Sequence, residues 1–142
     1  PDRLNSWRIA RLKEYGVNAY RAAHNPPTPA ILNACDTLGM LVMDEMRMLS
    51  SSDEGLKQMQ TIIRRDRNHP SIIIWCFGNE EHAIQGSEKG RMIVERMKAV
   101  HRKLDPSRPC TAAMNGSWGR IHLRSGRTRI ELLQNRQYRC RT

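Results

Sequence analysis

The chain contains a buried strand that ends abruptly in polar side chains. Residues 72–77 are all apolar, Ile-Ile-Ile-Trp-Cys-Phe. A run without alternation is typical of a strand that is covered on both faces, as in a parallel sheet. Gly78 then allows a sharp turn, and Asn79, Glu80 and Glu81 follow at once. We therefore expect ionisable groups at the carboxyl end of a buried parallel strand, where α/β folds place their functional residues.

The rest of the chain alternates between short apolar strands and amphipathic helices. Strands are predicted to begin near residues 17, 41, 72 and 110, with one helix between each neighbouring pair. Right-handed crossovers are the usual outcome of this order, so the strands are expected to be parallel with the helices outside them. The strand ends then share one edge of the sheet. The polar residues expected at this edge, called the rim below, are His24, Asp44, Glu45, Asn79, Glu80 and Asn115.

A carboxylate that follows a strand also has a simpler interpretation. Most such residues are solvated loop residues or N-caps of the next helix, so spacing alone does not assign a catalytic role to Glu80.

The net charge of +10 is concentrated near the end of the sequence. Residues 120–142 hold seven arginines against a single acidic residue, Glu131, which leaves only +4 for residues 1–119. A basic chain would ordinarily suggest a nucleic acid partner. Arginine-rich runs without a folded nucleic-acid-binding domain are a weak signal of nucleic acid binding, so we do not expect nucleic acid to be the partner. We interpret residues 120–142 as a basic tail of unassigned structure, either frame-shifted or disordered.

The cysteines and the hydropathy exclude several classes of protein. The four cysteines form no Cys-x-x-Cys pair, which argues against a zinc site or a redox dithiol. Cys35, Cys76 and Cys110 lie in apolar stretches and are expected to be buried. No run of about 18 apolar residues is present, so the sequence predicts no membrane partner. No signal-peptide pattern is visible either, and the localisation stays open between cytoplasm and periplasm.

The stretch Arg-Asp-Arg-Asn-His-Pro-Ser-Ile-Ile-Ile-Trp at residues 65–75, followed by Gly-Asn-Glu at 78–80, resembles the signature of glycoside hydrolase family 2. This is the β-galactosidase and β-glucuronidase family. Its Asn-Glu pair contains the general acid/base, so the resemblance implies that role for Glu80. It also implies that Asn79 hydrogen-bonds the 2-hydroxyl of the sugar.

A second stretch, Gly-Val-Asn-Ala-Tyr-Arg-Ala-Ala-His-Asn-Pro-Pro at residues 16–27, is similar to the second barrel strand of the same family. The arginine and the histidine of that strand line the sugar pocket. The resemblance therefore implies substrate-binding roles for Arg21 and His24. It implies no certain cofactor and leaves open a divalent metal near Glu80.

The resemblance covers about residues 1–119 and implies strands two to five of an eight-stranded barrel. The expected fold is therefore α/β, a partial (β/α)8 TIM barrel with parallel strands, because a complete barrel needs roughly 250 residues. The inner face of an incomplete barrel is expected to expose Val42, Ile72, Ile74 or their neighbours, and the isolated chain is expected to associate. The resemblance also implies that the intact protein has several domains and can be oligomeric.

The expected activity is hydrolysis of O-glycosidic bonds in a carbohydrate, β-galactosidase-like and retaining. Family members use a second glutamate, the nucleophile, at the end of the seventh strand. The glutamates after Glu80 are Glu81, Glu88, Glu95 and Glu131, and none matches that strand. The chain is thus expected to be a fragment that carries the acid/base without the nucleophile. The alternative is a non-catalytic remnant that binds carbohydrate or has a structural role.

Overall fold

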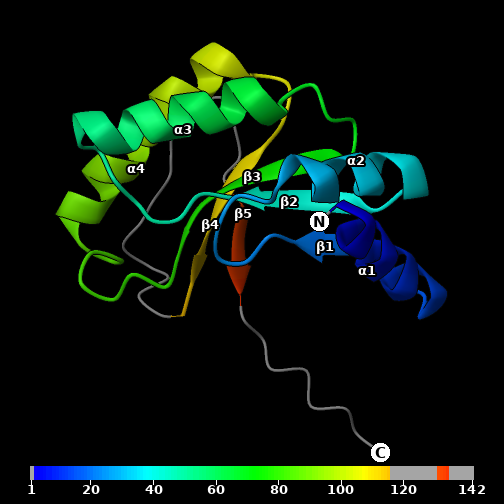
Figure 1. Ribbon diagram of the computed structural model, residues 1–142. Coiled ribbons are helices and arrows are strands. Elements are labelled where there is room, and N and C mark those ends of the chain that lie inside the picture. The colour runs from blue at the N-terminus through cyan, green and yellow to red at the C-terminus, as the bar shows by residue number, and fades with distance from the viewer. Residues whose placement is uncertain (1, 116–130, 135–142) are drawn as a thin grey trace, which may run out of the picture.

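The computed structural model describes residues 2–115 and 131–134 and contains one parallel sheet with helices against it (Figure 1). The strands lie in the order β1-β2-β3-β4-β5. They are β1 (Ala19–Arg21), β2 (Leu41–Glu45), β3 (Ile72–Asn79), β4 (Cys110–Met114) and β5 (Glu131–Gln134). The helices are α1 (Asp2–Glu14), α2 (Pro29–Leu38), α3 (Asp53–Asp66) and α4 (Glu88–Leu104). None of these helices is long and apolar enough to cross a membrane.

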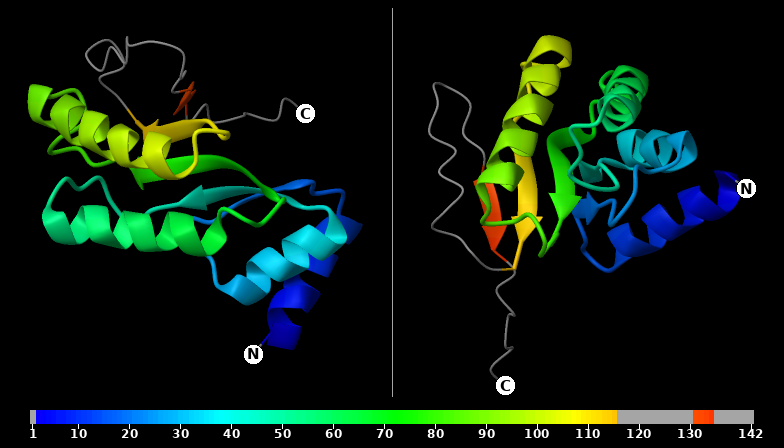
Figure 2. Two further views of the ribbon diagram at one scale, coloured as in Figure 1. Left: turned by 90° about the horizontal axis from the view of Figure 1, so that it is seen from above. Right: turned by 90° about the vertical axis from the view of Figure 1, so that its left-hand side faces the viewer.

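The predicted α/β fold with parallel strands in chain order is confirmed for β1 to β4. The helices lie around the outside of the strands, as in a section of a TIM barrel (Figure 2). β5 extends the sheet in parallel, with Glu131 opposite Thr111 in the register. This strand lies inside the segment 120–142, for which the sequence predicted no element. The rest of that segment, including Cys140, lies outside the described residues.

Local signals in the sequence fix the ends of α2 and α3. Pro29 opens α2, where its missing N–H loses no hydrogen bond, and Gly39 ends it in the left-handed region at φ 68°. Ser52 caps α3 by accepting a hydrogen bond from the Gly55 backbone N–H at 3.1 Å. These ends set where β2 and β3 begin, and therefore which residues reach the carboxyl edge.

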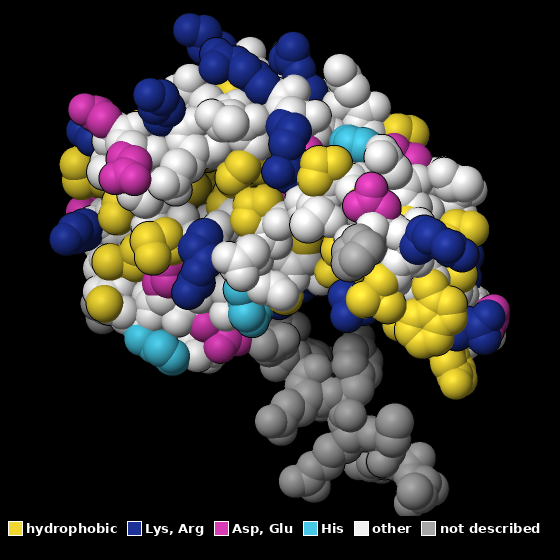
Figure 3. Space-filling view, in the orientation of Figure 1, with side chains coloured by type: hydrophobic (Ala, Val, Ile, Leu, Met, Phe, Trp, Pro, Cys, Tyr) yellow, Lys and Arg dark blue, Asp and Glu magenta, His cyan; other side chains and the backbone are white. Residues whose placement is uncertain are grey.

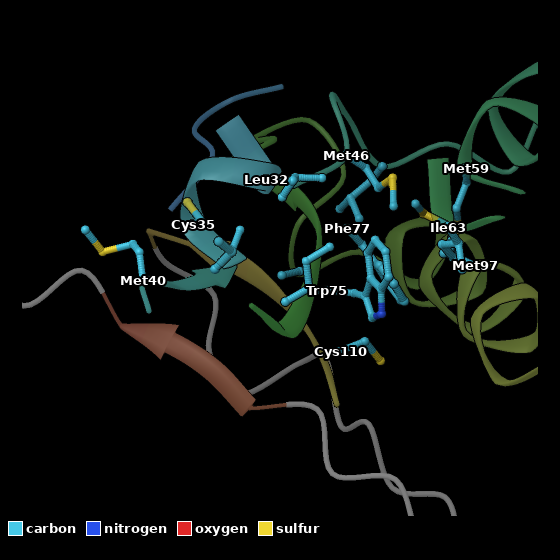
Figure 4. Packing of buried hydrophobic residues seen from close by; sticks show 14 of the residues in the cluster. Leu32, Cys35, Met40, Met46, Met59, Ile63, Trp75, Phe77, Met97 and Cys110 are labelled. Atoms are coloured by element: carbon cyan, nitrogen blue, oxygen red, sulfur yellow. The ribbon is translucent and has the colours of Figure 1, made fainter. Parts of the chain in front are cut away.

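The core lies between the sheet and the helices. Trp75 and Phe77 of β3 are fully buried there, against Met59 and Ile63 of α3 and Met97 of α4 (Figure 4). The indole N–H of Trp75 donates to a carboxylate oxygen of Asp105 at 2.9 Å, which satisfies a polar group that water cannot reach. The predicted burial of Cys35, Cys76 and Cys110 is confirmed. The central strand is thereby held rigidly, up to the residues that end it.

The prediction that Val42, Ile72, Ile74 or their neighbours are exposed holds for neighbours and not for Val42 and Ile72. Both are buried, and the exposed neighbours are Leu41 and Ile73, at 43% and 45%. The register between β2 and β3 shifts at this point, since Val42 pairs with Ile72 but Met43 pairs with Ile74. Ile73 is the extra residue of this bulge and has no partner on β2. A second group of exposed apolar side chains lies on α1 and directly after it (Figure 3), namely Leu4, Trp7 and Tyr15.

We expect the isolated chain to self-associate through this exposed apolar surface. β1 pairs only with β2 among the described strands, so its free edge adds unpaired backbone groups to the exposed Ile73 and Leu41. The substitution Ile73→Lys should weaken association about tenfold or more, because a buried isoleucine contributes roughly 1.5–3 kcal/mol. Sedimentation velocity over a concentration series measures this. Met92→Lys on the outer face of α4 serves as the control, and a wild-type chain that stays monomeric and melts cooperatively would contradict the expectation.

Candidate active site

The carboxyl ends of neighbouring strands bring together residues that are far apart in the sequence. Arg21 is the last residue of β1, Glu45 of β2 and Asn79 of β3, and Asn115 directly follows β4. The guanidinium of Arg21 donates from Nη2 to Oδ1 of Asn79 at 2.6 Å, across 58 positions of sequence. The parallel register therefore builds a polar site at this edge from single residues of each strand.

Glu45 lies at the centre of this site. Its side chain is 0% exposed, although its partners Arg21 and His24 keep 27% and 49% of their side-chain surface open. Oε2 accepts from Arg21 Nε at 2.6 Å, and Oε1 lies 2.9 Å from Nδ1 of His24. The sequence placed Glu45 at the rim but gave no sign that it joins these two residues. That contact depends on the register of β1 against β2.

Glu80 follows β3 and has an unusual backbone conformation. Its φ is 50°, in the left-handed region that L-residues other than glycine rarely adopt. The backbone N–H of Glu80 donates to the carbonyl of Ala113 on β4 at 2.9 Å. Its carboxylate oxygen Oε2 accepts from Nδ2 of Asn115 at 3.4 Å. The half-buried side chain is thus held at the rim by contacts to the next strand.

Asn115 also contacts two residues of the loop after β3. Its Nδ2 lies 3.1 Å from Nε2 of His82, and its Oδ1 accepts a hydrogen bond from Nε2 of Gln85. Sequence reasoning did not identify His82 or Gln85. Their closeness in sequence to Glu80 was the only signal, because no spacing rule connects them with a residue on β4.

Glu81 has a different environment from Glu80. Its Oε1 accepts from the backbone N–H of Leu49, in the loop after β2, at 2.5 Å. A Cβ on Gly78 would lie 2.7 Å from this oxygen and 2.9 Å from the Leu49 nitrogen, so only glycine fits at position 78. Burial raises the pKa of Glu81. This carboxylate therefore joins two loops and is turned toward the backbone of one of them.

The expectation that Asp44 joins the rim is wrong. Successive side chains of a strand point to opposite faces, so Asp44 points away from the face that Glu45 occupies. Asp44 is fully buried, and neither of its carboxylate oxygens has a hydrogen-bond partner among the described residues. Burial, and next the nearby carboxylate of Asp66, raise the pKa of Asp44 to about 8. Asp66 itself accepts two hydrogen bonds from Arg65, at 2.6 Å each.

The site contains no evident metal centre. Among residues 2–115, no three or more His, Cys, Asp or Glu side chains are grouped so that they could hold a metal ion. The described part of the rim carries carboxyl, amide, guanidinium and imidazole groups.

Comparisons with known proteins relate this arrangement to one family. The family model for "Glycosyl hydrolases family 2, TIM barrel domain" matches residues 3–55 and 50–131. A putative β-glucuronidase from Formosa agariphila is 36% identical over 118 residues, which is 75% of this chain and 11% of that protein. The β-galactosidase BoGH2A from Bacteroides ovatus is 31% identical over 158 residues, covering 81% of this chain and 19% of that protein.

Solved structures show the same relationship. A glycosyl hydrolase family 2 member from Bacteroides cellulosilyticus matches with a TM-score of 0.77 and 37% identity, over 84% of this chain and 17% of that structure. The chain spans less than a fifth of the length of each of these three proteins. Because the family model covers most of the sequence and the parallel sheet has the fold of solved members, the chain belongs to glycosyl hydrolase family 2, within its TIM barrel domain.

Proposed function

We propose that this chain carries the general acid/base of a retaining glycoside hydrolase, and that Glu80 has this role. The observation that supports it most directly is the hydrogen bond from Arg21 to Asn79, the residue before Glu80. This bond fixes the direction of the amide beside the carboxyl group. Together with the contact from Asn115 to Glu80, it gives an ordered polar site in a domain of a hydrolase family.

The geometry suits the chemistry of double displacement. In a retaining enzyme one carboxylic acid protonates the leaving oxygen, and a carboxylate about 5–5.5 Å away attacks the anomeric carbon. The acid, now ionised, then takes a proton from the water that releases the sugar. Glu80 would do both. Asn79 would donate to the 2-hydroxyl through Nδ2, since its Oδ1 already accepts from Arg21, while Arg21 and His24 would orient the ring.

The nucleophile in this proposal lies outside the described residues. Two other carboxylates are near Glu80 on the described rim, and both are engaged. Glu45 is fully buried between Arg21 and His24, and Glu81 binds the backbone of Leu49. Neither is directed at a sugar, so a carboxylate on another strand of the barrel would attack the anomeric carbon.

The proposed substrates are carbohydrates with a β-linked sugar. The relatives named above are a β-galactosidase and a putative β-glucuronidase, whose sugars differ in the configuration at C4 and in the group at C6. Both substrate types belong in the test. We also propose that the intact protein has further domains, because the matches cover only 11% and 19% of these relatives.

We expect the 142-residue chain alone to show no sustained turnover of aryl β-galactosides or aryl β-glucuronides. Activated aryl groups leave without protonation by an acid, but their displacement still needs a nucleophile. We propose no nucleophile among the described residues of this chain. A chimera in which residues 2–115 replace the matching segment of BoGH2A should restore steady-state release of the aryl group. Sustained turnover by the chain alone would place the nucleophile among its own residues. A folded chimera that is silent on both substrates would favour the non-catalytic remnant.

A further inference from the structure

Glu45 is a fully buried carboxylate at the end of β2. A charged group with 0% exposure is costly unless both of its oxygens are bound, and here Arg21 and His24 bind one each. Buried ion pairs are often no more stabilising than apolar side chains of the same volume. The burial of this ion pair is therefore weak evidence that Glu45 is present for stability. The polar arrangement indicates a role in orienting the two residues that Glu45 contacts.

The first consequence concerns the amide before the acid/base. Arg21 binds Glu45 through Nε at 2.6 Å and Asn79 through Nη2, also at 2.6 Å. A guanidinium is planar and rigid, so fixing Nε fixes Nη2 as well. Because guanidinium only donates, Asn79 must turn Oδ1 toward Arg21 and leave Nδ2 on the other side. Glu45 thus determines, through Arg21, which hydrogen-bonding group Asn79 presents.

The second consequence concerns the tautomer of His24. An ionised carboxylate only accepts hydrogen bonds, so the nitrogen 2.9 Å from Glu45 Oε1, which is Nδ1, must carry the proton. In the neutral ring Nε2 is then an acceptor, and 49% of the side-chain surface of His24 is open. Without Glu45, nothing among the described contacts of His24 would select this tautomer.

We propose that Glu45 is a positioning residue for the glycosidic reaction. It presents Asn79 Nδ2 as a donor and His24 Nε2 as an acceptor, two complementary contacts for neighbouring hydroxyls of one sugar ring. The part that concerns sugar binding rests on the proposed function. The part that concerns hydrogen bonding within the site does not.

The experiment uses the chain labelled with ¹⁵N in its histidines and magic-angle-spinning NMR, which tolerates self-association. At pH 8.5 histidine rings are ordinarily neutral, and the two nitrogens then have distinct shifts. Wild-type His24 is expected to show the Nδ1–H form. In Glu45→Gln the new amide must turn its oxygen to Arg21, so its NH2 group faces His24 and Nδ1 becomes the acceptor. We expect the tautomer ratio to reverse, with at least about tenfold preference for Nε2–H.

The chain contains a matched control at a distance from the rim. His69 Nδ1 lies 2.6 Å from Oδ2 of Asp36, whose Oδ1 accepts from the Ser71 backbone N–H at 3.0 Å. Glu45→Gln should leave His69 in the Nδ1–H form, which also reports an intact fold. By the same reasoning Asp36→Asn should reverse the tautomer of His69 and leave His24 unchanged.

The kinetic readout uses the chimera with BoGH2A. Glu45→Gln should lower kcat/KM about 10- to 100-fold and raise KM, because His24 no longer presents Nε2 as an acceptor to the sugar. A loss of folded enzyme alone would leave KM unchanged, and Asp36→Asn should leave both constants near wild type. A wild-type His24 in the Nε2–H form, or an unchanged His24 in Glu45→Gln with native His69, would overturn the proposal. An inactive unmodified chimera would overturn the proposed function and the kinetic part only, since the NMR result stands independently.

Discussion

Replacing Glu80 by glutamine in the chimera with BoGH2A should lower steady-state turnover of substrates with poor leaving groups by about 10²–10⁴-fold. Glutamine keeps the shape of the side chain and the contact with Asn115 but has no proton to give, and general acid catalysis supplies an acceleration of this size. The value of kcat/KM for an aryl glycoside series measures the loss. The loss should shrink as the leaving group becomes more acidic, because protonation then matters less.

The same variant should separate the two steps of the reaction. An activated substrate should still transfer its sugar to the enzyme, while hydrolysis of the intermediate stalls without a base to activate water. A burst of aryl release followed by slow turnover is the expected time course. Azide should accelerate the slow phase, because an anionic nucleophile needs no general base, and it should yield a glycosyl azide of retained configuration.

Glu81→Gln is the matched control for this experiment. It removes the neighbouring charge, and its amide oxygen can still accept from the Leu49 N–H. We expect less than a tenfold change in kcat/KM and no burst. Equal losses in Glu80→Gln and Glu81→Gln, or a Glu80→Gln loss independent of the leaving group, would contradict the assignment of the acid/base.

The largest effect on stability should come from Asp44. Burial, followed by the carboxylate of Asp66, raises the pKa of Asp44 from 3.8 to about 8. Between these values the folded chain keeps a proton that the unfolded chain loses, so the free energy of unfolding falls as pH rises from about 4 to 8 and levels off above. The stability lost over this interval is up to about 6 kcal/mol.

Asp44→Asn should remove this dependence on pH. The variant should match the wild type near pH 4 and exceed its stability by several kcal/mol above pH 8, since asparagine is neutral throughout and can donate to Asp66. Urea unfolding followed by tryptophan fluorescence at submicromolar concentration measures the difference. Asp53→Asn, at an exposed position in the first turn of α3, should shift stability by less than about 1 kcal/mol with no such slope. A parallel pH profile for wild type and Asp44→Asn would disprove the mechanism.

The sequence predicted the fold well because its signals are local. The spacing of apolar residues and the residues that end each element locate the helices and strands. Gly39 and the Ser52 cap, for example, act on residues only a few positions away. The parallel order then follows from general rules for crossovers. β5 was missed because nothing near residues 131–134 marks a strand, and its only described neighbour in the sheet is β4, which ends 17 positions earlier.

The site was less predictable because its contacts depend on register. Alternation along β2 requires Asp44 and Glu45 to face opposite sides, but the sequence does not say which of them faces the rim. The bulge at Ile73 likewise depends on how β2 pairs with β3. The strand ends identified the rim residues as a group, whereas the bridge from Glu45 to Arg21 and His24 required the pairing of β1 with β2.

The backbone conformation of Glu80 has an evolutionary consequence. At φ 50° a side chain raises the energy by about 1 kcal/mol or more relative to glycine. Every glutamate codon becomes a glycine codon through one base change. Mutations that remove this backbone strain therefore arise repeatedly. A population selected only for folding would therefore drift toward glycine at position 80. Glutamate would persist there only where selection also acts on what its carboxyl group does.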